Sequence, residues 1–239
     1  PVKNTVDRSE AFVSDYQGRD LIVDMELALD ADGTFRALRS SNISNVGAHC
    51  VSLSPLSKGS GIITGSYRIP LAHLRSRATF SNTPPTNAYR SSGRPEIIYC
   101  VECMVEKTAR TLGFDPIELR RKNLVTNEEM PYKNAVGMNY DSGKYEKSLD
   151  MVMGLNDWEG FAARKVEAKS RGKILGRGVA HYVESSIGSP VEQAELHVRV
   201  EDDRLDLVIG TQPSGQGHET SFAQVASEYL GLPIEQVNV

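Results

Sequence analysis

The stretch "RPEIIYCVECMVEKTARTLGFDPIELRRKN", residues 94–123, predicts two consecutive helices. Pro95 suits the first turn of the first helix, and Gly113 suits a left-handed stop at its end. Asp115 then suits the N-cap of a second helix that begins with Pro116. The first helix carries one continuous and mostly apolar stripe with i, i+1, i+4, i+7 and i+8 spacing, formed by Ile97, Ile98, Val101, Met104, Val105, Thr108, Ala109 and Leu112.

Strand patterns flank this helix pair. Residues 20–30 alternate between apolar and polar side chains, "DADG" marks a turn, and the chain resumes as a strand, which predicts a hairpin over 20–44. A second hairpin of the same kind is predicted over 193–212. Helices alternating with such hairpins are typical of an α+β fold with mixed sheets and packed helices. The remaining predictions are a loop over 48–66, short strands at 66–70, 75–82, 174–185 and 232–239, a polar connection over 124–143, two helical pieces over 144–173 and a helix over 220–231.

Composition narrows the class of protein. The net charge of −4 argues against a nucleic-acid partner, because binding nucleic acid needs a basic surface patch. No apolar run approaches the roughly 18 to 20 residues of a membrane span. Three cysteines fit a reducing compartment, which predicts a cytoplasmic protein. Cys100 and Cys103 have C-x-x-C spacing, but a zinc site needs about two more ligands. Two small residues on a helix are therefore favoured, and no metal site is predicted.

The two ends of the sequence predict a fragment. The chain opens "PVKNTVDRSE" without an initiator Met, and it stops inside an apparent strand.

Two loops have the composition of a binding site. "GTQPSGQGHET", residues 210–220, leads from a strand through glycines into a helix, so its free backbone N–H groups are suited to bind an anion or a polar ligand. Gln216 and His218 add side-chain donors. The loop lacks the third glycine of a dinucleotide fingerprint and the lysine of a P-loop, so a nucleotide site is the weaker interpretation. A plain turn remains an alternative.

The second loop is "NTPPTNAYRSSGRPE", residues 82–96, in which Arg90 lies between Tyr89 and two serines. A guanidinium held by a restricted loop can fix a planar or anionic partner through several donors. The alternative is a buried arginine–carboxylate pair, which composition alone favours. Elsewhere, Glu184 is a lone carboxylate that could line a site. The histidines at 49, 73, 181 and 197 occur singly and are interpreted as structural or exposed.

Taken together, the loops resemble the molybdenum hydroxylases, the xanthine dehydrogenase and aldehyde oxidase family. In bacterial members related to the carbon monoxide dehydrogenase large subunit, an A-Y-R-G-A-G-R-P-E-like loop precedes a helix ending in L-G-x-D-P. "GQGHETSFAQVASEYLGLP" resembles their second cofactor loop, and "PVKNTVDRSEAF" resembles a P-V-K-W-x-x-x-R-x-E segment, with Asn4 in place of Trp. The resemblance covers nearly the whole chain, with the motifs in the family's order.

The resemblance implies two parts of molybdenum-binding domains. Residues 1–125 would end the first domain, 126–172 would form a helical linker, and 173–239 would begin the second. The implied cofactor is molybdopterin with molybdenum, in its cytosine dinucleotide form. The implied reaction hydroxylates an aldehyde or an N-heterocycle, a small-molecule substrate, with water as the oxygen source.

The resemblance also assigns residues and partners. Tyr89, Arg90 and Ser91 would approach the metal and the substrate. The pterin and its phosphates would be held by Gly215, Gln216, Gly217, His218 and Thr220. Electrons would pass to [2Fe–2S] clusters and FAD on partner subunits or domains, and the rest of the large subunit would complete the site.

Three departures limit what this chain is expected to do. The carbon monoxide enzymes have a cysteine at the position of Ser91, so copper–molybdenum chemistry is disfavoured. The family's Gly-rich G-G-x-F-G segment would lie before Pro1, and its general-base glutamate would lie beyond Val239. The fragment is therefore expected to be inactive alone. A non-catalytic binding or assembly module of the same fold is the alternative.

Overall fold

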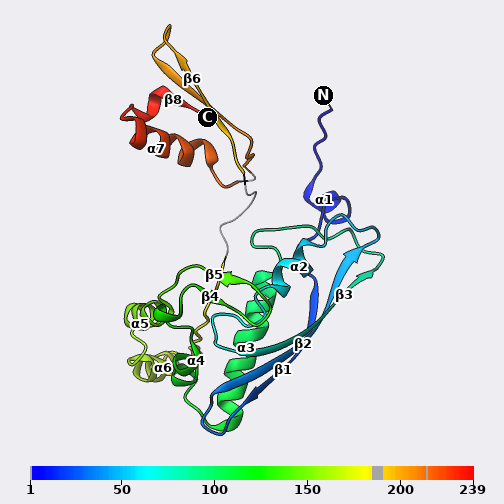
Figure 1. Ribbon diagram of the computed structural model, residues 1–239, viewed down its shortest axis with the longest axis vertical. Coiled ribbons are helices and arrows are strands. Elements are labelled where there is room, and N and C mark those ends of the chain that lie inside the picture. The colour runs from blue at the N-terminus through cyan, green and yellow to red at the C-terminus, as the bar shows by residue number, and fades with distance from the viewer. Residues whose placement is uncertain (1, 185–190, 214) are drawn as a thin grey trace. The chain divides into compact units, whose positions relative to one another are not determined.

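The computed structural model describes residues 2–184, 191–213 and 215–239. The chain forms two compact units, Pro1–Glu184 and Ser185–Val239. Figure 1 shows both units with their helices and strands labelled. Both combine helices with small sheets, which confirms the predicted α+β class.

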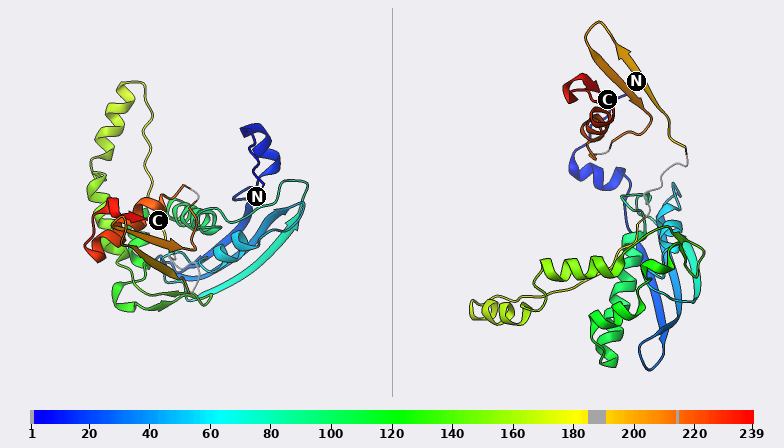
Figure 2. Two further views of the ribbon diagram at one scale, coloured as in Figure 1. Left: turned by 90° about the horizontal axis from the view of Figure 1, so that it is seen from above. Right: turned by 60° about the vertical axis from the view of Figure 1, so that its left-hand side comes forward.

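The first unit is built on a three-stranded sheet in the order β1-β2-β3. β1 (Leu21–Leu29) and β2 (Phe35–Gly47) pair antiparallel, which confirms the first predicted hairpin, and β3 (Leu71–Phe80) pairs parallel to β2. Figure 2 shows the sheet as a curved layer with α3 along its inner face. The helices of this unit are α1 (Arg8–Ser14), α2 (Ser54–Ser60), α3 (Arg94–Leu112), α4 (Pro116–Asn123), α5 (Tyr145–Leu155) and α6 (Phe161–Ser170).

The helix pair forms as the sequence predicts. Gly113 adopts φ 79° at the end of α3, and the Asp115 side chain accepts hydrogen bonds from the backbone N–H groups of Ile117 and Glu118. The apolar stripe of α3 packs against the alternating inward side chains of β1, which places the core between helix and sheet. Leu112, at the end of the stripe, is exposed instead.

A buried ionic network crosses this core. Arg120 is 1% exposed, and its Nε donates to Glu102 Oε2 at 3.0 Å while its Nη1 donates to Glu106 Oε2 at 3.1 Å. The Tyr67 hydroxyl donates to Glu102 Oε1 at 2.6 Å. A buried arginine has to be paired, so these side chains fix α3 and α4 relative to each other.

Three sequence predictions for this unit are wrong in detail. Residues 48–66 contain α2 rather than loop alone. A single strand, β3, replaces the two short strands predicted at 66–70 and 75–82, and Tyr67 pairs only through one bridge with Leu124. The connection over 124–143 holds the 3-10 turn η1 (Asn127–Glu129) and a two-stranded sheet of β4 (Tyr132–Lys133) and β5 (Asn139–Tyr140).

The strand predicted over 174–185 is also wrong for residues 174–184, which form no strand, and Ser185 lies outside the described residues. The alternating pattern has a different cause. Val179, His181 and Val183 pack onto the first unit while the residues between them face away, so the segment is extended without a ladder partner.

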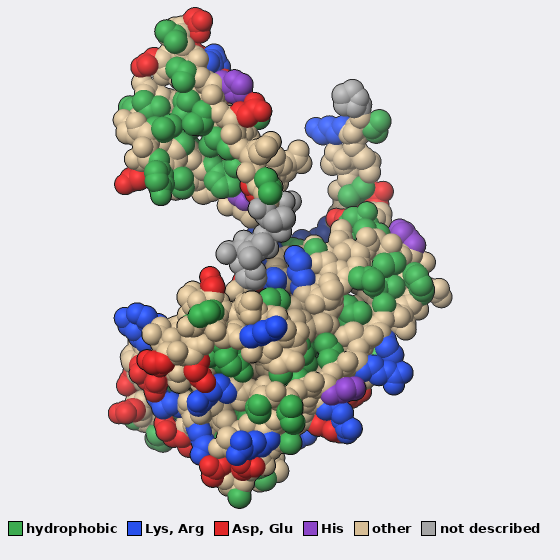
Figure 3. All heavy atoms as spheres, in the orientation of Figure 1, with side chains coloured by type: hydrophobic (Ala, Val, Ile, Leu, Met, Phe, Trp, Pro, Cys, Tyr) green, Lys and Arg blue, Asp and Glu red, His purple; other side chains and the backbone are tan. Residues whose placement is uncertain are grey.

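The second unit holds a three-stranded sheet, β6-β7-β8. β6 (Ala194–Arg199) and β7 (Arg204–Ile209) form the predicted antiparallel hairpin, and β8 (Val237–Asn238) follows the 3-10 turn η2 (Ile234–Gln236) and pairs parallel to β7. α7 (His218–Leu230) ends at Gly231 with φ 67°, as predicted. Much of its apolar face is exposed in this unit, with Tyr229 at 86%. Figure 3 shows apolar side chains gathered on the visible surface of the unit.

Within the described residues, no helix is both long enough and apolar enough to cross a membrane.

Candidate functional site

The loop before α3 is held in a tight left-handed turn. Ser91, Ser92 and Gly93 have φ values of 65°, 41° and 87°, a region that costs a residue with a side chain roughly 1–2 kcal/mol. At Gly93 a Cβ atom would lie 1.7 Å from the backbone oxygen of Pro55, so only glycine fits. Two backbone hydrogen bonds close the turn, from Ser92 N to Tyr89 O at 3.1 Å and from Arg94 N to Ser91 O at 3.3 Å.

Arg19 fixes the other side of this loop. Its Nη2 donates to the Arg90 carbonyl at 2.9 Å, its Nη1 pairs with Glu96 at 3.1 Å, and its guanidinium lies 5.5 Å from the centre of the Tyr89 ring. The Arg90 side chain itself is exposed and donates to none of the described residues. The main chain at Arg90 is therefore fixed, and its guanidinium stays available to a ligand.

The buried arginine–carboxylate pair that composition favours is formed by Arg94 instead. Arg94 is 7% exposed, and its Nη1 donates to Glu184 Oε1 at 2.5 Å. The Tyr182 hydroxyl donates to the other carboxylate oxygen of Glu184 at 3.1 Å. Sequence reasoning missed this role of Arg94, because nothing local distinguishes it from Arg90 and its partner is 90 residues away.

Ser91 lies beside the same cluster. Burial raises the pKa of the Tyr182 hydroxyl, the nearby Ser91 side chain counteracts this, and the hydrogen bond and charge of Glu184 raise the pKa further. Tyr182, Glu184 and Arg94 thus form a continuous hydrogen-bonded chain at the base of the loop.

His181 is buried next to the network of Tyr67, Glu102 and Arg120. Its ring meets the Tyr67 ring edge-on at 6.3 Å between centroids, and its Nε2 is buried with no partner among the described residues. Burial and, to a lesser extent, the positive charge of Arg120 lower the pKa of His181 from 6.5 to about 4. The sequence interpretation of this histidine as structural agrees with that position.

This depressed pKa predicts a loss of stability in mild acid. The unfolded chain binds more protons than the folded one between pH 6.5 and about 4, so the free energy of unfolding falls as pH falls through this window. Between these pH values, we expect the free energy of unfolding of the wild type to fall by about 1–3 kcal/mol relative to that of His181→Gln, which has no titrating group at position 181. Denaturant unfolding at half-unit pH steps measures this. Parallel curves for the two proteins would contradict the assignment.

The second loop lies in the other unit, between β7 and α7. Gly215 and Gly217 have φ values of 92° and 73°, and a Cβ atom at either position would meet no atom of the described residues within 4 Å. The glycines therefore serve the backbone conformation and leave open space beside it. Gly217 is the N-cap of α7 and has no side chain that could accept from the first-turn N–H groups, of which Thr220 N donates to the Gly217 carbonyl at 3.1 Å.

The side chains of this loop add polar groups around that space. The Nδ1 atom of His218 is buried and has no hydrogen-bond partner within the described ranges, while its ring packs on Phe222 at 4.8 Å between centroids. Gln216 and Thr220 are exposed on either side of it. This loop is suited to bind an anionic, phosphate-bearing group. It combines two glycines with open space beside them, the N-terminus of α7 and the buried ring nitrogen of His218.

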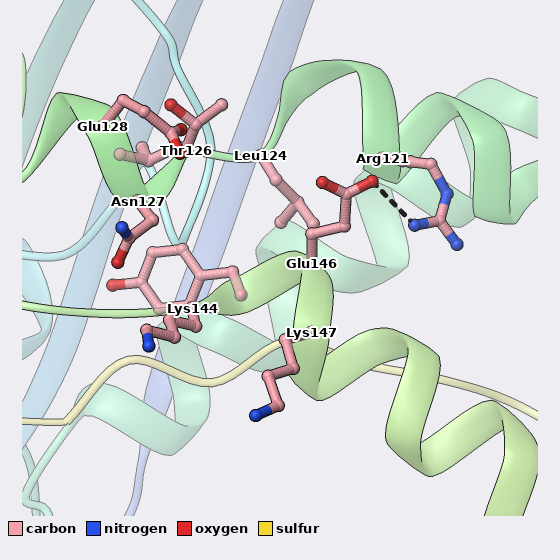
Figure 4. A pocket seen from close by; sticks show the side chains of 10 residues that line it. Arg121, Leu124, Thr126, Asn127, Glu128, Lys144, Glu146 and Lys147 are labelled. Carbon is pink, nitrogen blue, oxygen red and sulfur yellow. Dashed lines mark hydrogen bonds and ion pairs between the residues drawn. The ribbon is translucent and has the colours of Figure 1, made fainter.

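A pocket of about 260 Å³ between α4 and α5 contains none of these residues. Figure 4 shows its lining, with Arg121 turned toward Glu146. Arg121 donates to Glu146 at 2.9 Å and to Asp150 at 2.7 Å. Its charge is already paired, so this recess does not compete with the two loops as a candidate site.

Comparison with known proteins identifies the family of this chain. Residues 1–124 and 152–239 each match a family described as a molybdopterin cofactor-binding domain. The chain is 32% identical to the carbon monoxide dehydrogenase large chain of Hydrogenophaga pseudoflava and 28% identical to the nicotine 6-hydroxylase large subunit of Paenarthrobacter nicotinovorans. All of this chain is covered in both cases, and it spans about a third of each relative, 32% and 31%.

Solved structures agree with the sequence matches. Quinoline 2-oxidoreductase from Pseudomonas putida 86 aligns with a TM-score of 0.87 at 31% identity, over 98% of this chain and 32% of that one. A Cu,Mo carbon monoxide dehydrogenase aligns with a TM-score of 0.80 at 29% identity, over the same shares of the two chains. Aldehyde oxidoreductase from Desulfovibrio gigas, at 20% identity, shares the fold, with a TM-score of 0.66 over 91% of this chain and 24% of that one. The predicted resemblance is thereby confirmed, and the chain belongs to the molybdopterin cofactor-binding domains of the molybdenum hydroxylase large subunits.

Proposed function

We propose that this chain is the central part of the molybdopterin-binding subunit of an oxidoreductase that hydroxylates an aldehyde or an N-heterocycle, with water as the oxygen source. The observation that carries the proposal is the pair of loops. Each lies in a segment matched by the molybdopterin-binding family, and the Arg90 guanidinium and His218 Nδ1 have no hydrogen-bond partner among the described residues. Relatives named as nicotine 6-hydroxylase and quinoline 2-oxidoreductase support a heterocyclic substrate.

In this proposal the loop of the second unit holds the cofactor. The backbone N–H groups at Gly215 and Gly217, together with Gln216, His218 and Thr220, would bind the pterin and its phosphates. When bound, the cofactor supplies the redox-active molybdenum needed for hydroxylation. The cytosine dinucleotide form, and electron transfer to [2Fe–2S] clusters and FAD on other subunits or domains, belong to the same proposal.

The loop of the first unit would face the substrate. Arg90 can donate several hydrogen bonds from a fixed main chain, which suits it to orient a planar or anionic group. Tyr89, at 58% exposure, offers a ring for contact. The division into domains at 1–125 and 173–239, with a linker over 126–172, remains part of this proposal.

Ser91 favours hydroxylation over carbon monoxide oxidation. Sequence identity does not distinguish between these two reactions, because a carbon monoxide dehydrogenase large chain is among the relatives, at 32% identity. A serine hydroxyl is a poor ligand for the soft Cu(I) ion that thiolates select.

The reaction can be tested on the full-length protein isolated with its partner subunits. We expect oxidation of at least one aldehyde or azaheterocycle with an artificial electron acceptor, and incorporation of ¹⁸O from labelled water into the product. Carbon monoxide serves as the comparison substrate. Oxidation of carbon monoxide alone would contradict the role of Ser91. A molybdenum-loaded protein with no activity on any substrate would favour the non-catalytic module.

A further inference from the structure

The segment of residues 174–184 is an extended strap on the first unit. Figure 1 traces it from the end of α6 to the start of the grey trace. The strap is held near its start by Arg177, whose guanidinium lies 4.0 Å from the Trp158 ring centre and 4.5 Å from that of Phe161. Further along, His181 and Val183 are buried. The strap is therefore docked from Arg177 to Glu184, while Ile174 at its start is 99% exposed.

The end of the strap meets the base of the loop before α3. Glu184 accepts from Arg94 at 2.5 Å and from the Tyr182 hydroxyl at 3.1 Å. Glu184 thus binds the last residue of the turn Ser91–Arg94 directly, and the Tyr182 hydroxyl holds the Glu184 carboxylate in place.

Burial makes this attachment energetically significant. Arg94 is 7% exposed, and a buried guanidinium without its carboxylate is costly. Gly93 packs so closely on the backbone of Pro55 that the start of α3 cannot shift toward α2 to compensate. The turn therefore depends on Glu184 to neutralise the buried Arg94 guanidinium. On the opposite side of the loop, Arg19 holds the Arg90 carbonyl.

We propose that Tyr182 and Glu184 are positioning residues, which hold the Ser91–Arg94 turn and thereby fix the direction in which Arg90 presents its guanidinium. Neither residue has to touch substrate or cofactor. The catalytic consequence rests on the proposed function, whereas the effect on the loop does not. Through Glu184, the last residue of the first unit, the position of the strap would then determine the conformation of the substrate-facing loop.

Hydrogen exchange in the full-length protein tests the structural part. In Tyr182→Phe and Glu184→Gln, we expect the amides of Ser92 and Arg94 to exchange about 3-fold to 10-fold faster, as the loss of one hydrogen bond implies. Glu146→Gln is the matched control, because it breaks an arginine–glutamate pair of 2.9 Å remote from the loop. Unchanged loop exchange in both strap variants would overturn the proposal. So would equal acceleration in the control.

Kinetics of the holoenzyme test the consequence. We expect Tyr182→Phe to lower kcat about 3-fold to 10-fold at unchanged molybdenum and pterin content, and Glu184→Asp, which keeps the charge, to recover part of the loss seen in Glu184→Gln. Equal kcat values in wild type and Tyr182→Phe would overturn the positioning role. A wild-type protein without molybdenum would count against the proposed function alone, since the exchange result stands independently. If Glu184→Gln does not fold, Tyr182→Phe decides, because Tyr182 is 44% exposed and its hydroxyl can be removed without opening the core.

Discussion

Replacing Arg90 by alanine is expected to lower kcat by about 100-fold to 1,000-fold, the range seen when one preorganised donor is removed from an active site. The structure supplies the reason. The Arg19 side chain holds the Arg90 carbonyl at 2.9 Å, and the left-handed turn of Ser91 to Gly93 fixes the main chain on the other side of Arg90. None of the N–H groups of the Arg90 guanidinium donates to a described residue, so they are all available to a ligand. Molybdenum and pterin content should stay close to that of the wild type. Steady-state kinetics with metal and pterin analysis of the same preparation measure both.

Arg75→Ala is the matched control for this change. Arg75 is an exposed arginine on β3, away from the loop, so its removal should leave kcat unchanged. An Arg90→Ala protein with full turnover would remove Arg90 from the site. A protein that unfolds or loses its cofactor in step with its activity would show that the loop is structural.

The second large effect concerns Gly217. A methyl group in Gly217→Ala would fill the open space beside the backbone, where the cofactor phosphates are proposed to approach. We expect cofactor retention to weaken on the order of 10-fold to 100-fold, since hydrogen bonds to charged groups contribute about 1.5–3 kcal/mol each. Gln216→Ala should likewise lower cofactor content more than it lowers the turnover of the molecules that remain loaded. Pterin fluorescence after denaturation, together with metal analysis, measures the retained fraction.

Gly231→Ala separates this effect from backbone strain. Gly231 caps the other end of α7 with φ 67°, close to the 73° of Gly217, and a Cβ atom there would also meet no atom of the part of the chain that is described within 4 Å. Both substitutions therefore carry a similar conformational cost of roughly 1–2 kcal/mol. Equal cofactor loss in the two variants would mean that strain in α7, and not contact with the ligand, is responsible.

The sequence predicts local structure well where one element carries its own signals. The stripe of α3, the Asp115 cap and the stops at Gly113 and Gly231 depend on residues within a few positions of each other, and all four form as expected except for the exposed Leu112 at the end of the stripe. The first hairpin is confirmed for the same reason, since alternation and turn chemistry are local.

The features that sequence reasoning missed depend on distant partners. The parallel pairing of β3 with β2 joins Ala37 to Leu71, which no local pattern encodes. The strap has the alternation of a strand, yet its inward residues pack on helices and on Tyr67 rather than on a neighbouring strand. Arg94 and Glu184 are 90 residues apart in sequence, so composition indicated a buried arginine near the loop without identifying which one it was.

Binding of molybdopterin is the property that both loops are proposed to serve, and it can be measured directly. Full-length protein produced with excess molybdate, and purified without added cofactor, should contain close to one molybdenum and one pterin per copy of this chain. The same preparation of Gly217→Ala should contain far less of both, and Gly231→Ala should match the wild type. A folded wild-type protein that carries neither molybdenum nor pterin under these conditions would contradict the assignment of both loops.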